Sequence, residues 1–420
     1  MTISAGSYLY EISDDEGALD DGIGTDGLSE FCHNLFFSFA RSDQRRWGEL
    51  YVRGLLTVPG RKTVKKISDL VAGGGVEQCL QQFVNQSTWD WGAVRRDLAT
   101  QMVSELEPMA WVVKEIVFPK NGDSSVGVAR QFTHSTGRVL NCQRAIAIFL
   151  VGAHGCCPVN WRLALPPAWD DDSSRREAAR VPADERCLPI WGHVLDALDE
   201  MVTGWGLPPA PVIADIRFEQ DADALTAGLE SLGLNFVVQV AGGSPAMVVK
   251  SGPSAALTLS FSDVITHSLK RSSIAMSTTW QIPAARPGRS PFIVTSLPAD
   301  EPAGPPMPRA RQAAPPVRSR MQFCRRQPRF VAAEWSAVRR SAKSIWLTTL
   351  DAFRQPSMVE LTELSDQVDA ELHDFYANTG LLHFEGRSFP GWQHYVTLVS
   401  IAHAWSHLCD APREAELAFN

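Results

Sequence analysis

A lysine and a glutamate interrupt an otherwise apolar stretch in the first third of the chain. The segment WVVKEIVFPK, residues 111–120, has the pattern of a buried strand except at Lys114 and Glu115. A lysine held away from water has a lowered pKa and can serve as a general base or form a Schiff base. An ion pair with a nearby acid is the more common arrangement, and we expect it for Lys114.

Two further groups of residues have side chains that bind metals. Cys156 and Cys157 follow His154, and His403 precedes His407 by four residues, on the same face of an expected helix. Adjacent cysteines rarely ligate one metal well, and this spacing matches no zinc pattern. The eight cysteines include no CxxC pair, so we expect buried free thiols. We expect packing roles for the two histidines.

The overall composition is that of a large globular protein. The 420 residues are 45% hydrophobic and 20% charged, and no apolar run approaches the roughly 20 residues that cross a bilayer. The N-terminus has neither the basic nor the apolar region of a signal peptide, so we expect a cytoplasmic location without membrane partners. The net charge of -8 weakens attraction of the whole protein to nucleic acid. Frequent arginine, alanine, glycine and proline indicate a GC-rich, actinobacterial genome.

The first 250 residues divide into three regions by their hydrophobic pattern. Residues 1–28 are acidic and glycine-rich, and they predict a disordered tail. Residues 29–105 carry apolar side chains at helical spacing, which predicts an N-terminal helical domain. Residues 106–250 show short apolar strands and then a strand-helix-strand pattern. This order predicts the first part of a mixed α/β core.

The rest of the chain predicts an interruption of this core and its completion. Residues 251–340 predict an insertion or linker, because eleven prolines occur at 283–328 and seven arginines at 309–329. The arginines suit phosphate contacts, although a solvated linker is the more common role of such a segment. Residues 341–420 predict the last core strand and the C-terminal helices.

Several blocks of sequence, in a fixed order, resemble insertion-sequence transposases of the DDE superfamily. The blocks include RRWGELYVRGLL, STWDW, VFPKNGDSSVGVARQ, NCQ, WRLALP, GWGLPPAPVIAD, IWLTTL and HFEGRSFPGWQHYVTL, and together they span roughly residues 30–405. The resemblance implies a ribonuclease-H-like mixed sheet with flanking helices, an N-terminal helical domain and an insertion in the core. It also implies three carboxylates that hold two divalent metals, Mg²⁺ or Mn²⁺.

The resemblance assigns these three carboxylates to Glu115, Asp215 and Asp369. The family has a stretch resembling DDTGFPK where this chain has KEIVFPK, so Glu115 takes the place of the first catalytic aspartate and Lys114 that of the acid before it. Asp215 ends the VIAD stretch and matches the second aspartate. Counting back from HFEGRS puts Asp369 at the family's glutamate. The expected catalytic residues are therefore Lys114 and the three acids, and the acids are the expected metal ligands.

Departures from the family pattern lead to three functional hypotheses. Two of the acids have a different length from the family's, and the basic residues that flank the third are missing. Mg²⁺ requires near-octahedral geometry, and a misplacement of about 1 Å can cost roughly 100-fold in rate. We therefore expect a transposase-derived protein that has lost strand transfer and has been repurposed, for example as an enzyme on a small molecule in bacterial specialised metabolism.

The alternatives retain DNA as the partner. One is a DNA-binding regulator that does not cleave, and the other is a metal-dependent nuclease with a Glu-Asp-Asp triad. A second copy of the chain, forming a homodimer, is a further candidate partner.

Overall fold

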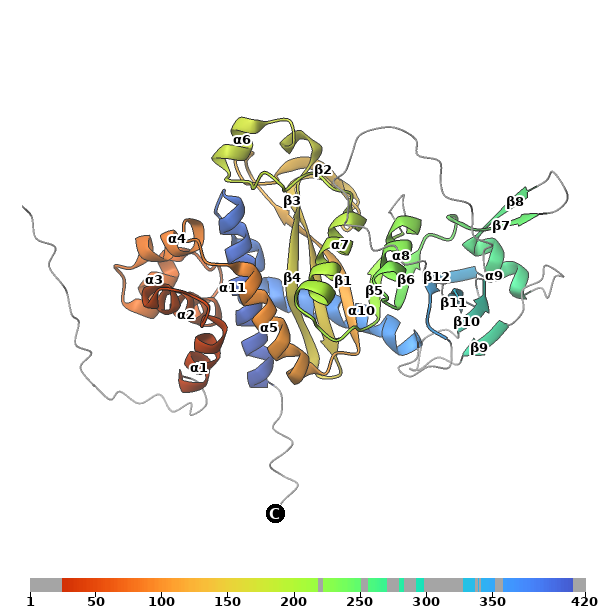
Figure 1. Ribbon diagram of the computed structural model, residues 1–420, viewed down its shortest axis with the longest axis horizontal. Coiled ribbons are helices and arrows are strands. Elements are labelled where there is room, and N and C mark those ends of the chain that lie inside the picture. Colours follow the sequence, from red (N-terminus) through yellow and green to blue (C-terminus); the bar gives the residue numbers. More distant parts are fainter. Residues whose placement is uncertain are drawn as a thin grey trace, which may run out of the picture.

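The computed structural model describes residues 25–217, 222–250, 256–269, 279–282, 292–297, 328–336, 339, 341–351 and 358–410. Of the expected acidic tail, residues 1–24 lie outside this set, as does nearly all of the arginine-rich segment 309–329. Along the longest axis, N-terminal helices occupy one end, a mixed sheet the middle, and a group of antiparallel strands the other end (Figure 1).

The N-terminal helices begin slightly earlier than the sequence predicts. They are α1 (Thr25–Leu35), α2 (Ser42–Thr57), α3 (Val64–Ala72), α4 (Glu77–Asn85) and α5 (Trp91–Leu106). Thr63 caps α3 by accepting a hydrogen bond from the Lys66 amide, and Asp90 caps α5. Helix α1 starts within the region expected to be a disordered tail. Its apolar face, with Leu28, Phe31 and Leu35, is buried, and this packing stabilises the helix.

The central sheet has the strand order expected of a ribonuclease-H-like fold. Its strands are β1 (Ala110–Pro119), β2 (Ala129–Thr133), β3 (Arg138–Gly152), β4 (Gly155–Ala164), β5 (Val212–Asp215) and β6 (Phe236–Val240). Strands β4, β3 and β1 are antiparallel neighbours, and β5 and β6 continue the sheet in parallel beyond β1. The C-terminal half of β3 is buried on both faces, as its continuous apolar run requires.

Helices cover both faces of this sheet. After β4 come a short 3₁₀ turn (Pro167–Trp169), α6 (Ser173–Ala178), α7 (Ile190–Asp199), a π-helical turn (Glu200–Gly204) and, beyond β5, α8 (Ala222–Ser231). Helix α7 packs against β3 and β4. Its buried face includes Val194, Ala197 and Leu198, which matches the amphipathic pattern of the sequence.

The region 251–340, which the sequence predicts to be an insertion or linker, contains regular elements. Within it are β8 (Ala256–Ser260), α9 (Phe261–Leu269), β9 (Thr279–Ile282), β10 (Phe292–Ser296) and β11 (Phe330–Ser336). It is flanked by β7 (Pro245–Lys250) and β12 (Ser341–Thr348). Strand β12 pairs with β6, and β11, β10 and β9 follow in antiparallel order. Apolar side chains of β10 and β11 are buried, so these strands extend the core despite the surrounding prolines.

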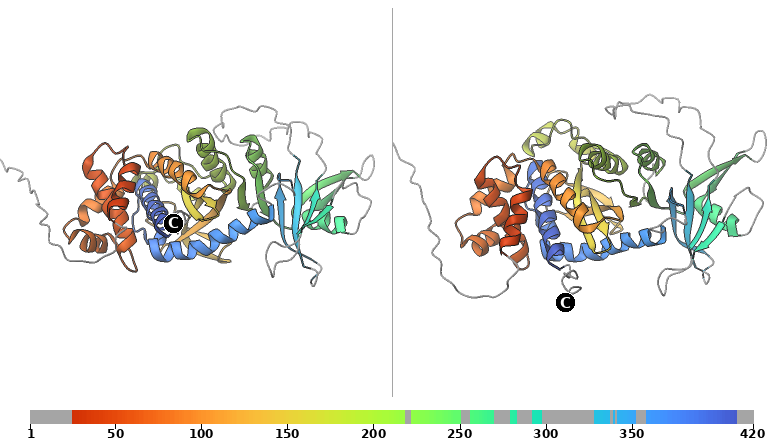
Figure 2. Two further views of the ribbon diagram at one scale, coloured as in Figure 1. Left: turned by 90° about the horizontal axis from the view of Figure 1, so that it is seen from below. Right: turned by 60° about the horizontal axis from the view of Figure 1, so that its bottom comes forward.

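The C-terminal segment joins the sheet to the N-terminal helices. It contains α10 (Met358–Asp374), a π-helical turn (Phe375–Thr379), a 3₁₀ turn (Leu381–His383) and α11 (Phe389–Asp410). Helix α10 runs along the sheet from the β12 end to α11 (Figure 2). Helix α11 contacts α2, α4, α5 and β4, and most of its side chains are buried. Among the described residues, no helix combines the length and hydropathy of a membrane span.

Candidate functional site

The two charged residues of β1 point to opposite faces of the sheet. Successive side chains of a strand alternate between faces, so Lys114 and Glu115 cannot share a site. Lys114 lies toward α10, which packs against β1, β5 and β3. Glu115 lies toward Arg144 of β3 instead.

Lys114 and Asp369 form the closest contact between the predicted site residues. The Lys114 ammonium lies 2.6 Å from Asp369 Oδ1 and 3.0 Å from the hydroxyl of Ser365, one turn earlier on α10. The lysine side chain is 13% exposed and that of Asp369 is 60% exposed. The pair is therefore half-open to solvent, with its positive member on the buried side. This is the ion pair that the sequence favours for Lys114.

Asp215 approaches the same face from the neighbouring strand. Strands β1 and β5 are parallel, with Val112 opposite Ile213. Continuing that register by two residues sets Asp215 beside Lys114 on the α10 face. The Asp215 carboxylate is held by the guanidinium of Arg217 at 2.6 Å, and it also accepts a hydrogen bond from the Arg217 backbone amide. Both contacts come from its own loop.

Glu115 lies away from these residues, on the α7 face of β1. Its carboxylate pairs with Arg144, which sits on β3 opposite Val117. Arg144 in turn lies near His193 of α7, where burial, together with Arg162 and Arg144, lowers the histidine pKa to about 4. The resemblance assigns the first acid to Glu115. The alternation of β1, however, puts Lys114 on the α10 face, where it pairs with Asp369.

The FPK motif that sets this register has a structural role in the fold. Phe118 is fully buried and packs edge-on against Trp392 of α11. Lys120 donates a hydrogen bond of 2.6 Å to the Phe384 carbonyl and also lies over the Phe384 ring. Burial lowers the pKa of Lys120 to about 8. The end of β1 is thereby fixed to the segment that precedes α11.

A separate cluster joins Cys156 and His403, for which the sequence predicts no metal site, with Glu371, which sequence reasoning missed. Cys156 of β4, Glu371 of α10 and His403 of α11 each offer a ligand atom, and these atoms all lie within 4.8 Å of one another. The sequence does not predict that these residues meet, since Cys156 and Glu371 are 215 positions apart. The nearest signal in the sequence is the i, i+4 spacing of His403 and His407.

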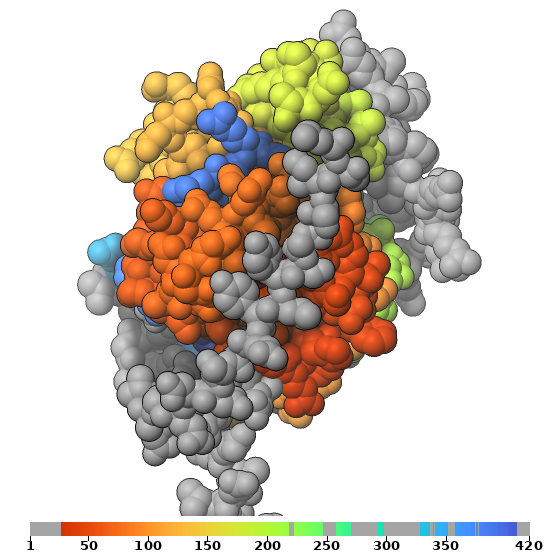
Figure 3. Space-filling view, turned by 90° about the vertical axis from the view of Figure 1, so that its left-hand side faces the viewer, coloured from red at the N-terminus to blue at the C-terminus, as the bar shows by residue number. Residues whose placement is uncertain are grey.

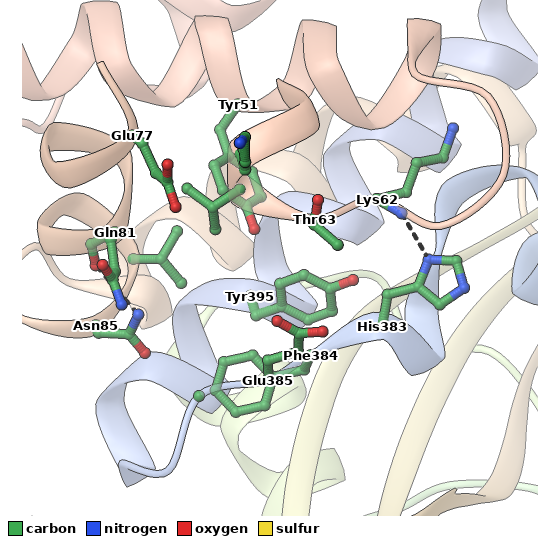
Figure 4. A pocket seen from close by; sticks show the side chains of 14 residues that line it. Tyr51, Lys62, Thr63, Glu77, Gln81, Asn85, His383, Phe384, Glu385 and Tyr395 are labelled. Atoms are coloured by element: carbon green, nitrogen blue, oxygen red, sulfur yellow. Dashed lines mark hydrogen bonds between the residues drawn. The ribbon is translucent and has the colours of Figure 1, made fainter. Parts of the chain in front are cut away.

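A polar cavity of about 370 Å³ opens between the N-terminal helices and the segment before α11. Figure 4 shows its side chains facing one another from these two parts of the chain. The Lys62 amide donates to Nδ1 of His383 at 3.1 Å. Tyr51 is only 2% exposed, and its hydroxyl has no hydrogen-bond partner among the described residues. The cavity has the size and mixed polarity of a small-molecule site.

Comparison with known proteins identifies the family. A family model described as DDE superfamily endonuclease matches residues 34–256, which is more than half of the chain. The match covers the N-terminal helices from the end of α1, strands β1–β6 and the β7 strand, and it agrees with the observed strand order. Endonucleases of this superfamily typically use divalent metals. No curated protein sequence matches the chain. The chain belongs to the DDE superfamily endonuclease family.

Proposed function

We propose that this transposase-derived protein keeps the DDE fold but no longer carries out metal-dependent DNA strand transfer. The observation that carries the proposal is the Lys114–Asp369 ion pair on the α10 face of β1. Lys114 lies on the face of β1 that α10 covers, and it pairs there with Asp369. A carboxylate at that position would attract divalent cations, whereas an ammonium repels them.

The residues expected to hold Mg²⁺ or Mn²⁺ do not fit a two-metal site. Such a site requires carboxylates that converge on metals about 3.5–4 Å apart. Glu115 points to the opposite face of the sheet and is paired with Arg144. Asp215 is paired with Arg217, and Asp369 with Lys114. Each acid thus has a cation from the protein itself, and no catalytic step through a metal follows from this arrangement.

Restoring a carboxylate at position 114 tests the proposal. Purified full-length protein and the Lys114→Asp variant are compared for Mn²⁺-dependent thermal stabilisation and for nicking of supercoiled DNA. We expect neither effect in the unaltered protein. The variant should gain stabilisation, about 2.7 kcal/mol when Mn²⁺ exceeds its Kd 100-fold.

The control variant changes the neighbouring acid on the other face. When Glu115→Gln is added to the Lys114→Asp variant, the stabilisation by Mn²⁺ should stay unchanged, because Glu115 lies away from Asp369. Mn²⁺-dependent nicking by the unaltered protein, lost on Asp215→Asn, would overturn the proposal in favour of a Glu-Asp-Asp nuclease.

For the present function of the protein we propose the binding of a polar small molecule as a substrate. The polar cavity lined by Tyr51, His383 and Tyr395 supports this proposal, because two parts of the chain enclose it and the Tyr51 side chain in its lining has no hydrogen-bond partner for its hydroxyl among the described residues. Phe384 and Tyr395 provide an apolar wall for such a ligand, and Glu77 and Glu385 provide charge.

The second candidate is DNA binding without cleavage, and a basic stretch in the helical region favours it. Residues 41–66 contain eight Lys or Arg residues and two acids, in a chain whose net charge is -8. Five of these cations are exposed: Arg41, Arg46, Arg61, Lys65 and Lys66. Figure 3 looks onto this end of the molecule, where α2–α4 form much of the surface in red and orange.

The salt dependence of duplex binding separates the two candidates. For DNA binding, log K should fall linearly with log salt concentration, by about 0.9 for each phosphate contact. The combined variant Lys65→Gln and Lys66→Gln should reduce that slope by up to about 1.8. Lys343→Gln is the matched control, since Lys343 lies on β12 and pairs with Glu334. Absence of salt-sensitive duplex binding leaves the small-molecule function.

A further inference from the structure

The cluster of Cys156, Glu371 and His403 is formed where three elements meet. Cys156 stands near the start of β4 and is fully buried, and its Sγ lies 2.9 Å from Glu371 Oε2. His403, on α11, is 7% exposed, and its Nε2 lies 3.1 Å from the Cys156 carbonyl oxygen. A thiol, a carboxylate and an imidazole thus converge in a largely buried space.

The hydrogen bond to the Cys156 carbonyl fixes which nitrogen of His403 is free. A carbonyl oxygen can only accept, so Nε2 carries the proton and Nδ1 keeps its lone pair. Metal-bound histidines commonly donate their second ring nitrogen to a carbonyl in this way. Burial also lowers the pKa of His403 to about 3, so the ring is neutral, as a ligand must be.

Glu371 is the charged member of the cluster. Burial by itself would raise the pKa of the Glu371 carboxyl, but hydrogen bonds from His407, Cys156 and Gln367 lower it to about 2. Burial raises the pKa of the Cys156 thiol well above its usual value, so the sulfur is protonated in the absence of a metal. Near neutral pH the cluster therefore combines an anionic carboxylate with two neutral soft or borderline ligands.

His407 supports the carboxylate from outside the set of three. Its Nε2 lies 3.1 Å from Glu371 Oε2, and its ring stands edge-on to that of His403. Gly155 makes room for it, because a Cβ at that position would lie 2.8 Å from His407 Nδ1. The φ of Gly155 is +144°, which also favours glycine. A residue that orients a ligand in this way is typical of metal sites.

A cavity of about 270 Å³ adjoins the cluster. Glu371, His403 and His407 line it, together with residues such as Phe375 and Asn378. Three protein ligands beside an open space are the pattern of zinc sites that keep one coordination position for water or substrate. In this arrangement the open position faces a volume large enough for a small organic molecule.

We propose that Cys156, Glu371 and His403 bind one Zn²⁺ ion, with a fourth position open to this cavity. Thiolate and imidazole ligands favour zinc over the Mg²⁺ or Mn²⁺ used with carboxylates alone. Tetrahedral zinc bonds of about 2.0–2.3 Å require ligand atoms roughly 3.3–3.8 Å apart, so shifts on the order of 1 Å complete the site. The site shares no ligand with the group of Lys114, Asp215 and Asp369, so the proposal does not depend on the loss of strand transfer.

Binding exchanges one proton for the metal. The Cys156 S–H bond breaks, its proton passes to solvent, and the sulfur bonds to zinc as a thiolate. Glu371 gives up the hydrogen bond from the thiol and keeps the one from His407. Because coordination releases a proton, affinity should fall with falling pH.

The test uses the full-length protein dialysed against Zn²⁺ or Co²⁺ and then against metal-free buffer. We expect one equivalent of zinc by elemental analysis. The Co²⁺ form should show a thiolate-to-cobalt charge-transfer band in the near ultraviolet. Cys156→Ser should abolish that band, and Glu371→Gln should weaken Zn²⁺ binding strongly. His407→Gln should weaken it by about 10–100-fold, as expected for an outer partner.

Matched controls separate the site from general thiol binding. Cys157→Ser changes the adjacent buried cysteine, whose side chain points to the other face of β4, and should retain the band. Cys79→Ser removes an exposed thiol and should also retain it. Circular dichroism confirms that each variant is folded. Less than stoichiometric zinc in the unaltered protein, or equal binding by folded Cys156→Ser and Cys157→Ser, would overturn the proposal.

Discussion

The two sides of α10 carry acids in contrasting surroundings. Asp369 meets the ammonium of Lys114 from β1 at 2.6 Å, whereas Glu371 meets the thiol of Cys156 and the ring of His407. Residues two apart on a helix lie on roughly opposite sides, so α10 contributes one acid to the contact with Lys114 and another to the cluster with Cys156. Asp369 is neutralised by a cation that is covalently part of the protein. Glu371 has the Cys156 thiol and the His403 imidazole nearby, and this set of ligands favours an added metal ion.

This contrast shows why the number of acids in a cleft says little about metal binding. The three acids of the DDE pattern survive in the sequence, yet each has its own cation: Arg144, Arg217 or Lys114. The cluster around Glu371 has a single carboxylate, but it also has the thiol and imidazole that zinc prefers.

Acid should produce the largest change, on the face of β1 opposite α10. The pKa of His193 is about 4 in the folded protein, and about 6.5 in an unfolded chain. The unfolded chain thus binds more protons between these values, so stability is full above pH 6.5 and falls as the pH drops toward 4. The loss due to His193 approaches about 3 kcal/mol.

Denaturant unfolding at pH 7 and pH 4.5 measures this loss. His193→Gln should lose less stability over that interval than the unaltered protein, because glutamine does not titrate. Equal losses would show that His193 is not held neutral by burial near Arg144 and Arg162.

Removing the charge of Glu371 should have the next largest effect. Glu371→Gln weakens the hydrogen bonds that the carboxylate accepts from Cys156, His407 and Gln367. We expect a loss of about 1–3 kcal/mol, the typical cost of disturbing buried polar partners. Chemical denaturation in a chelating buffer measures it without any metal contribution. A neutral result would mean that Glu371 is held in place by packing rather than by these partners.

Filling the space beside His407 should have a somewhat smaller effect. Gly155→Ala places a methyl group 2.8 Å from His407 Nδ1 in a backbone conformation that disfavours side chains. A loss of about 1–2 kcal/mol is expected, together with weaker Zn²⁺ binding. Gly137→Ala is the control, because its φ is also positive but nothing lies near its added Cβ. Gly155→Ala should therefore weaken zinc binding, whereas Gly137→Ala should not.

The smallest effect is expected at Asp369. Its side chain is 60% exposed, so Asp369→Asn should cost below about 1 kcal/mol despite the short contact with Lys114. Thermal unfolding at low and high salt measures it, and the small loss should shrink further at high salt. A loss as large as that of Glu371→Gln would remove the distinction between the two sides of α10.

Much of the fold follows from local patterns in the sequence. The apolar run of β3 predicts a central strand, and the amphipathic repeat of α7 predicts a helix that covers the sheet. The strands β9–β11 were harder to foresee, because short segments among prolines gain stability only from pairing with β12.

The sequence by itself determined the family, the mixed α/β fold and the charged pair inside β1. Only the tertiary structure decided that Lys114, rather than Glu115, pairs with Asp369. The strand pattern predicts that these two neighbours point to opposite faces of the sheet, but it does not predict which face α10 covers. The tertiary structure also decided that Cys156 and His403, 247 positions apart, share a site with Glu371. Such contacts depend on how α10 and α11 pack on β4, and that packing is set by the whole core rather than by any local pattern.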